Sequence, residues 1–209
     1  MSMTAREKRA KEAIIELLGE NGYASYAKIF RDFDLHLTAD PSVVAYMIPD
    51  KGVITVNEGL LLEQVGVCVR HEILHEYLNH LNRMITVLAV RHGLDPDEVL
   101  AQTDADDYQK IKTELFQNDV FNYAGDYEIS NVGYTEEDKE IIRNIDINGN
   151  IVHGLVTDDV QDHPDWVNMS LEELYDAVIE DRMSKPIIIN GNFMNDTTFV
   201  AEDGKIYGI

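Results

Sequence analysis

The chain has 209 residues, enough for one sizeable domain with a tail and too few for two full-sized domains. Hydrophobic residues make up 44% of it, which argues against disorder. A formal net charge of −22 argues against binding to nucleic acid backbones or anionic membranes. The single cysteine, Cys68, excludes an intramolecular disulfide. No segment has the length of a membrane span, and the N-terminus lacks the apolar core of a signal peptide, so we expect a cytoplasmic protein of a bacterium or an infected bacterial cell.

The N-terminal quarter predicts helices followed by a hairpin. Residues 4–18 have the spacing of an amphipathic helix, and a second short helix is expected over residues 26–33. Two β-rich runs, 43–48 and 53–57, flank Pro49-Asp50-Lys51-Gly52, which has the residues of a tight turn.

The middle of the chain predicts helices. A mostly buried helix is expected from Leu60 to about Met84, with Gly66 as a candidate break. Further helices are expected over 85–92, after Asp95-Pro96, over about 106–130, and over 171–183 behind a capping box of Ser170 and Glu173.

After Gly133 the turn signals are of the hairpin type: Asn148-Gly149-Asn150, Asn190-Gly191-Asn192 and Asp203-Gly204. We expect residues 186–209 to form a small β-rich appendage. The predicted fold class is therefore α+β, mainly helical, with a hairpin upstream of the helix that carries His71.

The stretch VRHEILHEYLNH indicates a metal site. His71 and His75 are four residues apart, about 40° of rotation and roughly 6 Å of rise on a helix, so both imidazoles reach one ion. Glu72 lies about 100° further round, where its carboxylate would flank the ion and accept a proton from water. The alternative is two ordinary core or surface histidines. The apolar surroundings argue against it, because buried polar groups without partners are costly.

Two neighbouring residues are not expected to bind the ion. On an unbroken helix His80 lies about 180° from His71, which indicates a structural role. The metzincin pattern would need glycine at Leu78 and histidine at Leu81. Cys68 is expected to be a small buried hydrophobic residue with no catalytic part.

A third ligand must come from elsewhere in the chain. The stretch FQNDVFNYAGDYEIS offers Asp119, Asn122, Asp126 and Glu128 on a predicted helix. A solvated acidic stripe is the alternative, but Tyr123 and Tyr127 indicate a substantially buried helix. We expect Asp126 to be the third ligand and take Glu128 as the second choice.

Four stretches of this chain together resemble a known family. They are the hairpin AYMIPDKGVITVNEG, the helix VRHEILHEYLNHLNR, the segment NYAGDYEIS, and the late SLEELYDAV behind Trp166. They are similar to zinc metallopeptidases of bacteria and phages that often occur fused to or beside a von Willebrand factor A-like domain. The resemblance covers roughly residues 35 to 180 and implies a metallopeptidase with one zinc ion and Asp126 as the third ligand. In this family a further His and Arg typically follow the HExxH helix, here His80 and Arg83. We expect the zincin-like metallopeptidase domain to extend over 1–185. The chain has no Asp-x-Ser-x-Ser site of the A-like domain, which favours a free-standing version such as a phage-encoded one.

The function expected from these residues is hydrolysis of a peptide or protein substrate by a zinc-activated water, with Glu72 as the base. Candidates for stabilising the oxyanion are Tyr123, Tyr127, Tyr134 and His153. The alternative is a binding or regulatory protein that keeps the metal as a structural clip. Four protein ligands would indicate the clip, and three would indicate the enzyme.

Overall fold

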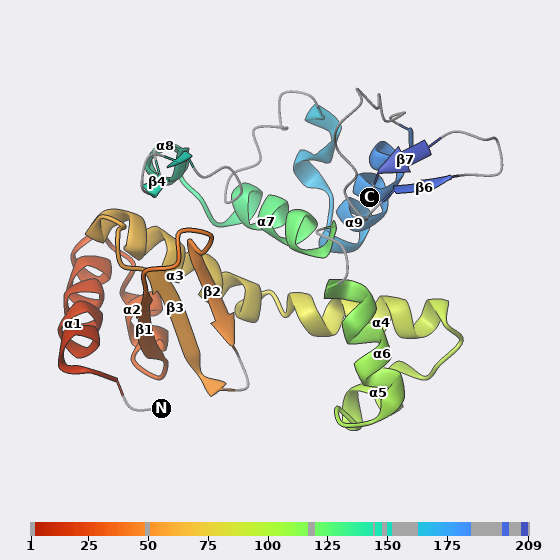
Figure 1. The fold of residues 1–209 in the computed structure, drawn as a ribbon, viewed down its shortest axis with the longest axis horizontal. Helices are drawn as coiled ribbons and strands as arrows, with labels where there is room; N and C mark the ends of the chain where they lie inside the picture. The colour runs from red at the N-terminus through yellow and green to blue at the C-terminus, as the bar shows by residue number, and fades with distance from the viewer. Residues whose placement is uncertain are drawn as a thin grey trace. The chain divides into compact units, whose positions relative to one another are not determined.

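The computed structural model describes residues 3–48, 51–116, 120–143, 145–147, 150–151, 163–184, 198–200 and 206–208. Within them the fold is mainly helical α+β with a small mixed sheet near the N-terminus, which confirms the predicted class at this coarse level (Figure 1). Two compact units are found, one of residues 1–80 and 129–159, the other of residues 81–128 and 160–209. The predicted boundary near residue 185 stays a prediction, and the segment 185–190 lies outside the described residues.

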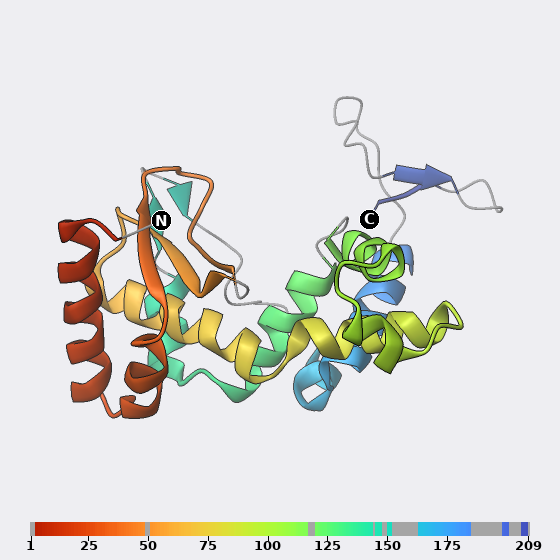
Figure 2. The same ribbon diagram turned by 90° about the horizontal axis from the view of Figure 1, so that it is seen from below.

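The first unit contains the three-stranded sheet and the helices around it. Its elements are α1 (Ala5–Glu20), α2 (Ala24–Phe30), β1 (Asp34–Thr38), β2 (Ala45–Ile48), β3 (Val53–Asn57), α3 (Leu62–Tyr77), α8 (Glu136–Arg143), β4 (Asp146–Ile147) and β5 (Asn150–Ile151). It also includes residues 129–132, the last turn of α7 (Val120–Val132). Figure 2 shows α3 running beneath the sheet and α1 standing beside it.

The sheet has the strand order β1-β3-β2. β2 and β3 pair antiparallel with Met47 opposite Ile54, which confirms the predicted hairpin. β1 pairs parallel with β3 on the other side, Leu35 opposite Ile54, and this strand was not predicted. The short pair β4–β5 forms where the turn at Asn148-Gly149 was predicted.

Apolar side chains from the sheet, α1, α2 and α3 form the core of this unit. The buried members are Ile14, Leu18, Ala27, Phe30, Leu35, Ile54, Val56, Val65, Val69 and Ile73. Gly66 lies inside α3 and does not break it, contrary to the expectation. A Cβ at Gly66 would lie 3.0 Å from Leu17 Cδ2, so the glycine allows α1 to approach α3 closely.

The helix with the histidines ends earlier than predicted. α3 stops at Tyr77, Asn79 adopts a left-handed conformation with φ 55°, and α4 (His80–Arg91) begins at the next residue. Asparagine tolerates this conformation better than most residues do. The assumption of an unbroken helix through His80 was therefore wrong.

The second unit is built mainly from helices. Its elements are α4, α5 (Pro96–Ala101), α6 (Asp106–Phe116), most of α7, the 3-10 helix η3 (Pro164–Asn168), α9 (Leu171–Ser184), and the antiparallel strands β6 (Thr198–Val200) and β7 (Ile206–Gly208). The single helix expected over 106–130 is thus two helices, α6 and α7. The predicted capping box of α9 is present: Ser170 N donates to Glu173 Oε2 at 2.8 Å, and Glu173 N donates to Ser170 Oγ at 3.4 Å.

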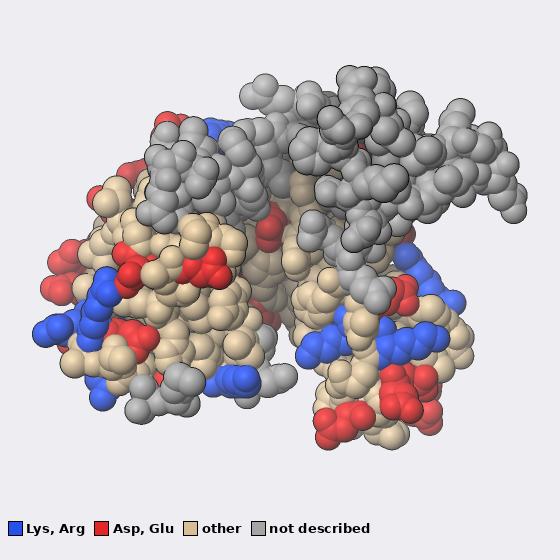
Figure 3. Space-filling model, in the orientation of Figure 1, with Lys and Arg blue, Asp and Glu red and all other residues tan. Residues whose placement is uncertain are grey.

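Charged side chains of both signs lie in separate patches on the described surface in the view of Figure 3. Acidic side chains gather over α5 and the start of α6, where Asp97, Glu98, Asp106 and Asp107 are all exposed. None of the helices in the described ranges combines the length and the hydropathy that crossing a membrane requires.

Candidate metal centre

Helix α3 carries the HEILH motif on its buried part. The run from Gln64 to Leu74 is buried without interruption, and within it His71 is 2% exposed and Glu72 8% exposed. His75, one turn later, is half-buried. The motif therefore lies where the helix passes from the packed interior towards solvent.

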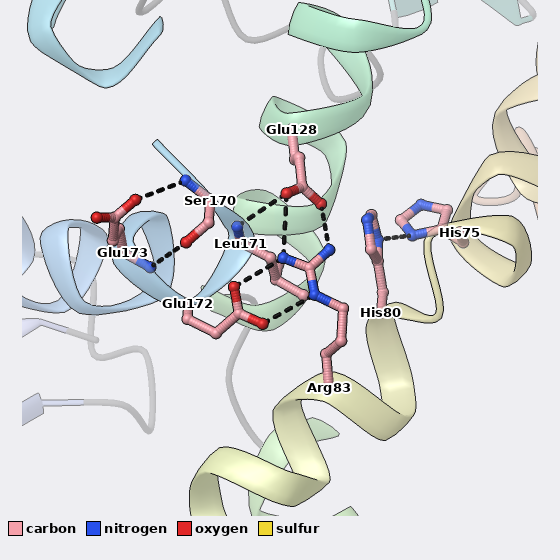
Figure 4. A network of polar contacts seen from close by, with 8 residues as sticks. All are labelled: His75, His80, Arg83, Glu128, Ser170, Leu171, Glu172 and Glu173. Atoms are coloured by element: carbon pink, nitrogen blue, oxygen red, sulfur yellow. Dashed lines mark hydrogen bonds and ion pairs between the residues drawn. The ribbon is translucent and has the colours of Figure 1, made fainter. Parts of the chain in front are cut away.

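The two imidazoles face each other through the same nitrogen. Nε2 of His71 lies 2.9 Å from Nε2 of His75, and the ring centroids are 4.6 Å apart. The other ring nitrogen, Nδ1, contacts a further side chain in each case. Nδ1 of His71 lies 2.6 Å from the hydroxyl oxygen of Tyr134. Nδ1 of His75 lies 2.9 Å from Nδ1 of His80 (Figure 4). Histidine ligands commonly bind a metal with one nitrogen while the other is held by such a partner.

Asp126 completes a group of three donors. One ligand atom each from His71, His75 and Asp126 lie within 4.8 Å of one another. Asp126 is partly buried and stands on α7. Just beyond the end of that helix, Gly133 lies so close to Leu74 that a Cβ on the glycine would overlap the leucine Cδ1.

The donors fit a metal ion of the zinc type. Two nitrogens bound to one tetrahedral ion at about 2.0 to 2.1 Å are themselves about 3.3 Å apart, so the rings need to separate by only a few tenths of an ångström from their 2.9 Å. Two imidazoles and a carboxylate also have the ligand number and type of catalytic zinc sites. The identity of the metal is not set by these ligands, which suit several divalent ions.

Glu128, the second-choice ligand, has other partners. Its carboxylate accepts hydrogen bonds from Arg83 Nη1 at 2.9 Å and Nη2 at 3.2 Å, and from Leu171 N at 3.0 Å (Figure 4). Arg83 also donates to Glu172 at 2.8 and 2.7 Å. Glu172 first, and then Glu128, raise the pKa of Arg83 above its usual range, although burial alone would lower it. Glu128 thus joins α7 to α4 and α9 and stands outside the group of three donors.

The two remaining candidates on this stretch are not among the three grouped donors of the described residues. Asp119 lies outside the described residues, and Asn122 is exposed.

Three of the four candidates for oxyanion stabilisation lie within the described residues, and each has different surroundings. Tyr134 contacts His71 at Nδ1, on the opposite side of the ring from Nε2. Tyr127 is fully buried and donates its hydroxyl to the carbonyl of His163 at 3.4 Å. Tyr123 is half-buried, and His153 falls outside the described residues. Tyr134 is thereby a partner of the His71 ring, a contact that spacing along the chain did not indicate.

Cys68 lies one helical turn before the motif and is fully buried. Burial, and secondarily the negative charge of Glu72, raise the pKa of its thiol well above the usual range. The sulfur therefore stays protonated at neutral pH, which accords with the expected role of a small hydrophobic residue.

The chain was compared with models of protein families, with curated proteins and with solved structures. No match was found in any of the three. What the chain does must therefore be argued from the residues themselves.

Proposed function

We propose that the chain is a zinc-dependent peptidase in which His71, His75 and Asp126 hold the ion and Glu72 is the general base. The observation that carries the proposal is the pair of Nε2 atoms 2.9 Å apart, each ring held at Nδ1, with the carboxylate of Asp126 beside them. The family resemblance noted from the sequence is consistent with it, but rests on the quoted motifs alone.

In the proposed reaction the ion acts as a Lewis acid and one carboxylate transfers the proton. A bound zinc ion supplies a Lewis acid that polarises a carbonyl and makes water more acidic. Glu72 accepts a proton from the attacking water as its oxygen bonds to the carbonyl carbon, and then gives that proton to the leaving amine nitrogen as the C–N bond breaks. Its position directly after His71 on α3 keeps the carboxylate beside the ligands without making it one of them.

An extended peptide has a place to bind in the same unit. β2 lies at the edge of the described sheet, where it pairs with β3 only, and it packs against α3. Tyr46 on this strand is 43% exposed. A substrate adding itself to such an edge would gain main-chain hydrogen bonds and present its backbone carbonyls in an extended form.

Replacing Glu72 by glutamine tests the proposal. Glu72→Gln keeps the shape of the side chain and removes the base, so we expect zinc content and thermal stability to persist while cleavage of a mixed peptide library falls by roughly 10² to 10⁴. His75→Ala should lose the metal as well as the activity. The matched control is Glu76→Gln, an exposed position on the same helix, which should change neither.

Full cleavage by Glu72→Gln with zinc still bound would show that the assignment of the base is wrong. X-ray absorption of the zinc-loaded protein adds an independent reading. Three protein ligands support the peptidase, and four would favour a structural clip instead.

A further inference from the structure

The contact between Tyr134 and His71 is made by a residue that belongs to no helix. Tyr134 lies between the end of α7 at Val132 and the start of α8 at Glu136. Its hydroxyl is 2.6 Å from Nδ1 of His71, and the two rings are 6.0 Å apart. For His71 to bind a metal through Nε2, the ring proton must sit on Nδ1, where it is donated to the tyrosine oxygen. A connecting segment orients a ring reliably only if something fixes the segment.

Hydrogen bonds in the first turn of α8 hold this segment in place. Thr135 N and Oγ1 both donate to Asp138 Oδ2 at 2.9 Å, and Asp138 N donates back to Thr135 Oγ1 at 3.2 Å. This reciprocal arrangement caps the helix and holds the residue that directly follows Tyr134. The conformation of the connection is thereby tied to the carboxylate of Asp138.

Asp138 is in turn tied to α3. Its Oδ1 forms a short ion pair with Nη2 of Arg70, and the two residues are 4% and 2% exposed. The guanidinium lies against the face of Tyr23, 3.7 Å from the ring centroid. Burial alone would raise the pKa of Asp138, but the hydrogen bonds from Arg70 and Thr135 outweigh it and lower the pKa.

Arg70 and His71 are consecutive on α3, so their side chains diverge by about 100°. Tyr134 lies in the connection between α7 and α8, and Asp138, four residues later, lies in the first turn of α8. The segment is therefore bound at two points to two adjacent residues of one helix, and apolar contacts between Val67, Cys68 and Ile142 hold α3 and α8 together. Its position relative to the His71 ring has little freedom left.

The ion pair is a poor candidate for a purely stabilising contact. Buried pairs lose hydration that their attraction often fails to offset, and replacing both partners by apolar residues is frequently neutral. Arg70 Nε adds to the cost, because it is buried with no hydrogen-bond partner among the described residues. What the pair provides is a defined geometry.

We propose that Arg70, Asp138 and Tyr134 form a positioning network that sets the ring of His71 for metal binding. The network rests on the proposed function only in that His71 is a metal ligand. It touches neither the ion nor a substrate. Arg70 and Asp138 act through the segment 134–138, and Tyr134 acts on Nδ1 directly.

The test measures zinc affinity by chelator competition, which does not depend on turnover. Tyr134→Phe should weaken zinc binding by roughly 10-fold to 100-fold, the range seen for partners of metal-bound histidines. The double variant Arg70→Met/Asp138→Leu avoids leaving one buried charge alone and should fold. We expect it to weaken zinc binding to a similar extent, with little further loss when Tyr134→Phe is added. Arg70→Gln/Asp138→Asn, which retains a neutral hydrogen-bonded link, should restore most of the affinity.

The control is the exposed pair of Arg91 and Asp176. Arg91→Met/Asp176→Leu should leave zinc affinity unchanged. The inference is overturned if the folded Arg70→Met/Asp138→Leu protein binds zinc as tightly as the wild type, or if its effect simply adds to that of Tyr134→Phe. Zinc binding that is lost in His71→Ala, without any peptide cleavage by the wild type, would remove the proposed peptidase function and leave the network standing. A wild-type protein that takes up no zinc would remove both.

Discussion

At the scale of single residues, two acidic side chains on one helix have different surroundings. Asp126 and Glu128 are two positions apart on α7, so they point about 200° apart. Asp126 lies with the two histidines, whereas Glu128 binds Arg83 and the backbone of Leu171. A count of acidic residues along this stretch does not distinguish them, but the direction of each side chain does.

We therefore expect Asp126→Ala to reduce zinc affinity and Glu128→Ala to reduce the free energy of unfolding. Asp126→Ala removes a ligand and should weaken zinc affinity at least 100-fold, with little loss of stability in the absence of metal. Glu128→Ala removes one of the two carboxylates that Arg83 binds, and should lower the free energy of unfolding by about 1 to 3 kcal/mol while zinc affinity changes far less. Chelator competition and urea unfolding of the zinc-free proteins measure the two quantities. If Glu128→Ala is the variant that loses its metal, the third ligand has been misassigned.

Sequence spacing sufficed for some members of the site and not for others. His71, Glu72 and His75 lie in one helix, where the separation along the chain sets their relative direction. Placing Asp126 required only that its helix be buried. The partners Tyr134 and His80 depend on where α7 and α3 end. The break at Asn79 has no strong sequence signal, because neither glycine nor proline marks it.

At the scale of elements, apolar periodicity predicted most of the helices. The elements that the sequence did not predict, β1 and α8, each have a physical reason. β1 is short and pairs with β3, and β2 lies between the two strands in the sequence. Because β1 and β3 are not joined by a tight turn, no hairpin signal marks β1. α8 was not predicted, because the turn signals that follow Gly133 in the sequence are of the hairpin type and favour strands. The pattern Thr135-x-x-Asp138 ahead of Ile141 and Ile142 is a capping signature that would have revealed it.

The junction of α1 with β1 gives a prediction that depends on pH. Glu7 accepts hydrogen bonds from Thr4 N, Leu37 N and His36 Nδ1, and so joins the start of α1 to β1. Burial alone would raise the pKa of Glu7, but these hydrogen bonds outweigh it and lower the pKa from 4.5 to about 2. Because the pKa is depressed in the folded state, the stabilisation is complete above about pH 4.5 and is lost as the pH falls towards 2.

Glu7→Gln should therefore be less stable than the wild type at pH 7, by up to roughly 3 kcal/mol, and the difference should shrink steadily between pH 4.5 and pH 2. Urea unfolding at a series of pH values measures it. Glu12→Gln, an exposed position on the same helix, serves as the control. A difference that stays constant down to pH 2 would mean that the charge of Glu7 contributes nothing.

At the scale of the whole molecule, the negative charge of the chain would attract metal ions even without the candidate metal centre. A net charge of −22 attracts any divalent cation to the surface, and exposed acidic groups such as those over α5 bind such ions weakly. Uptake of metal by this protein is therefore no proof of the proposed centre. A specific site must show itself by its dependence on the histidines and by the stability that it adds to the fold.

Zinc should raise the melting temperature through His71 and His75. An ion that binds only the folded state at about 1,000 times its dissociation constant adds roughly 4 kcal/mol, which for a chain of this size corresponds to about 8 to 16 °C. Differential scanning calorimetry with zinc, with calcium at the same concentration, and with an excess of chelator measures the effect. His71→Ala/His75→Ala should show no zinc-specific gain. If that variant gains as much from zinc as the wild type, or if calcium gives the wild type the same rise, the stabilisation comes from the acidic surface and the histidines hold no ion.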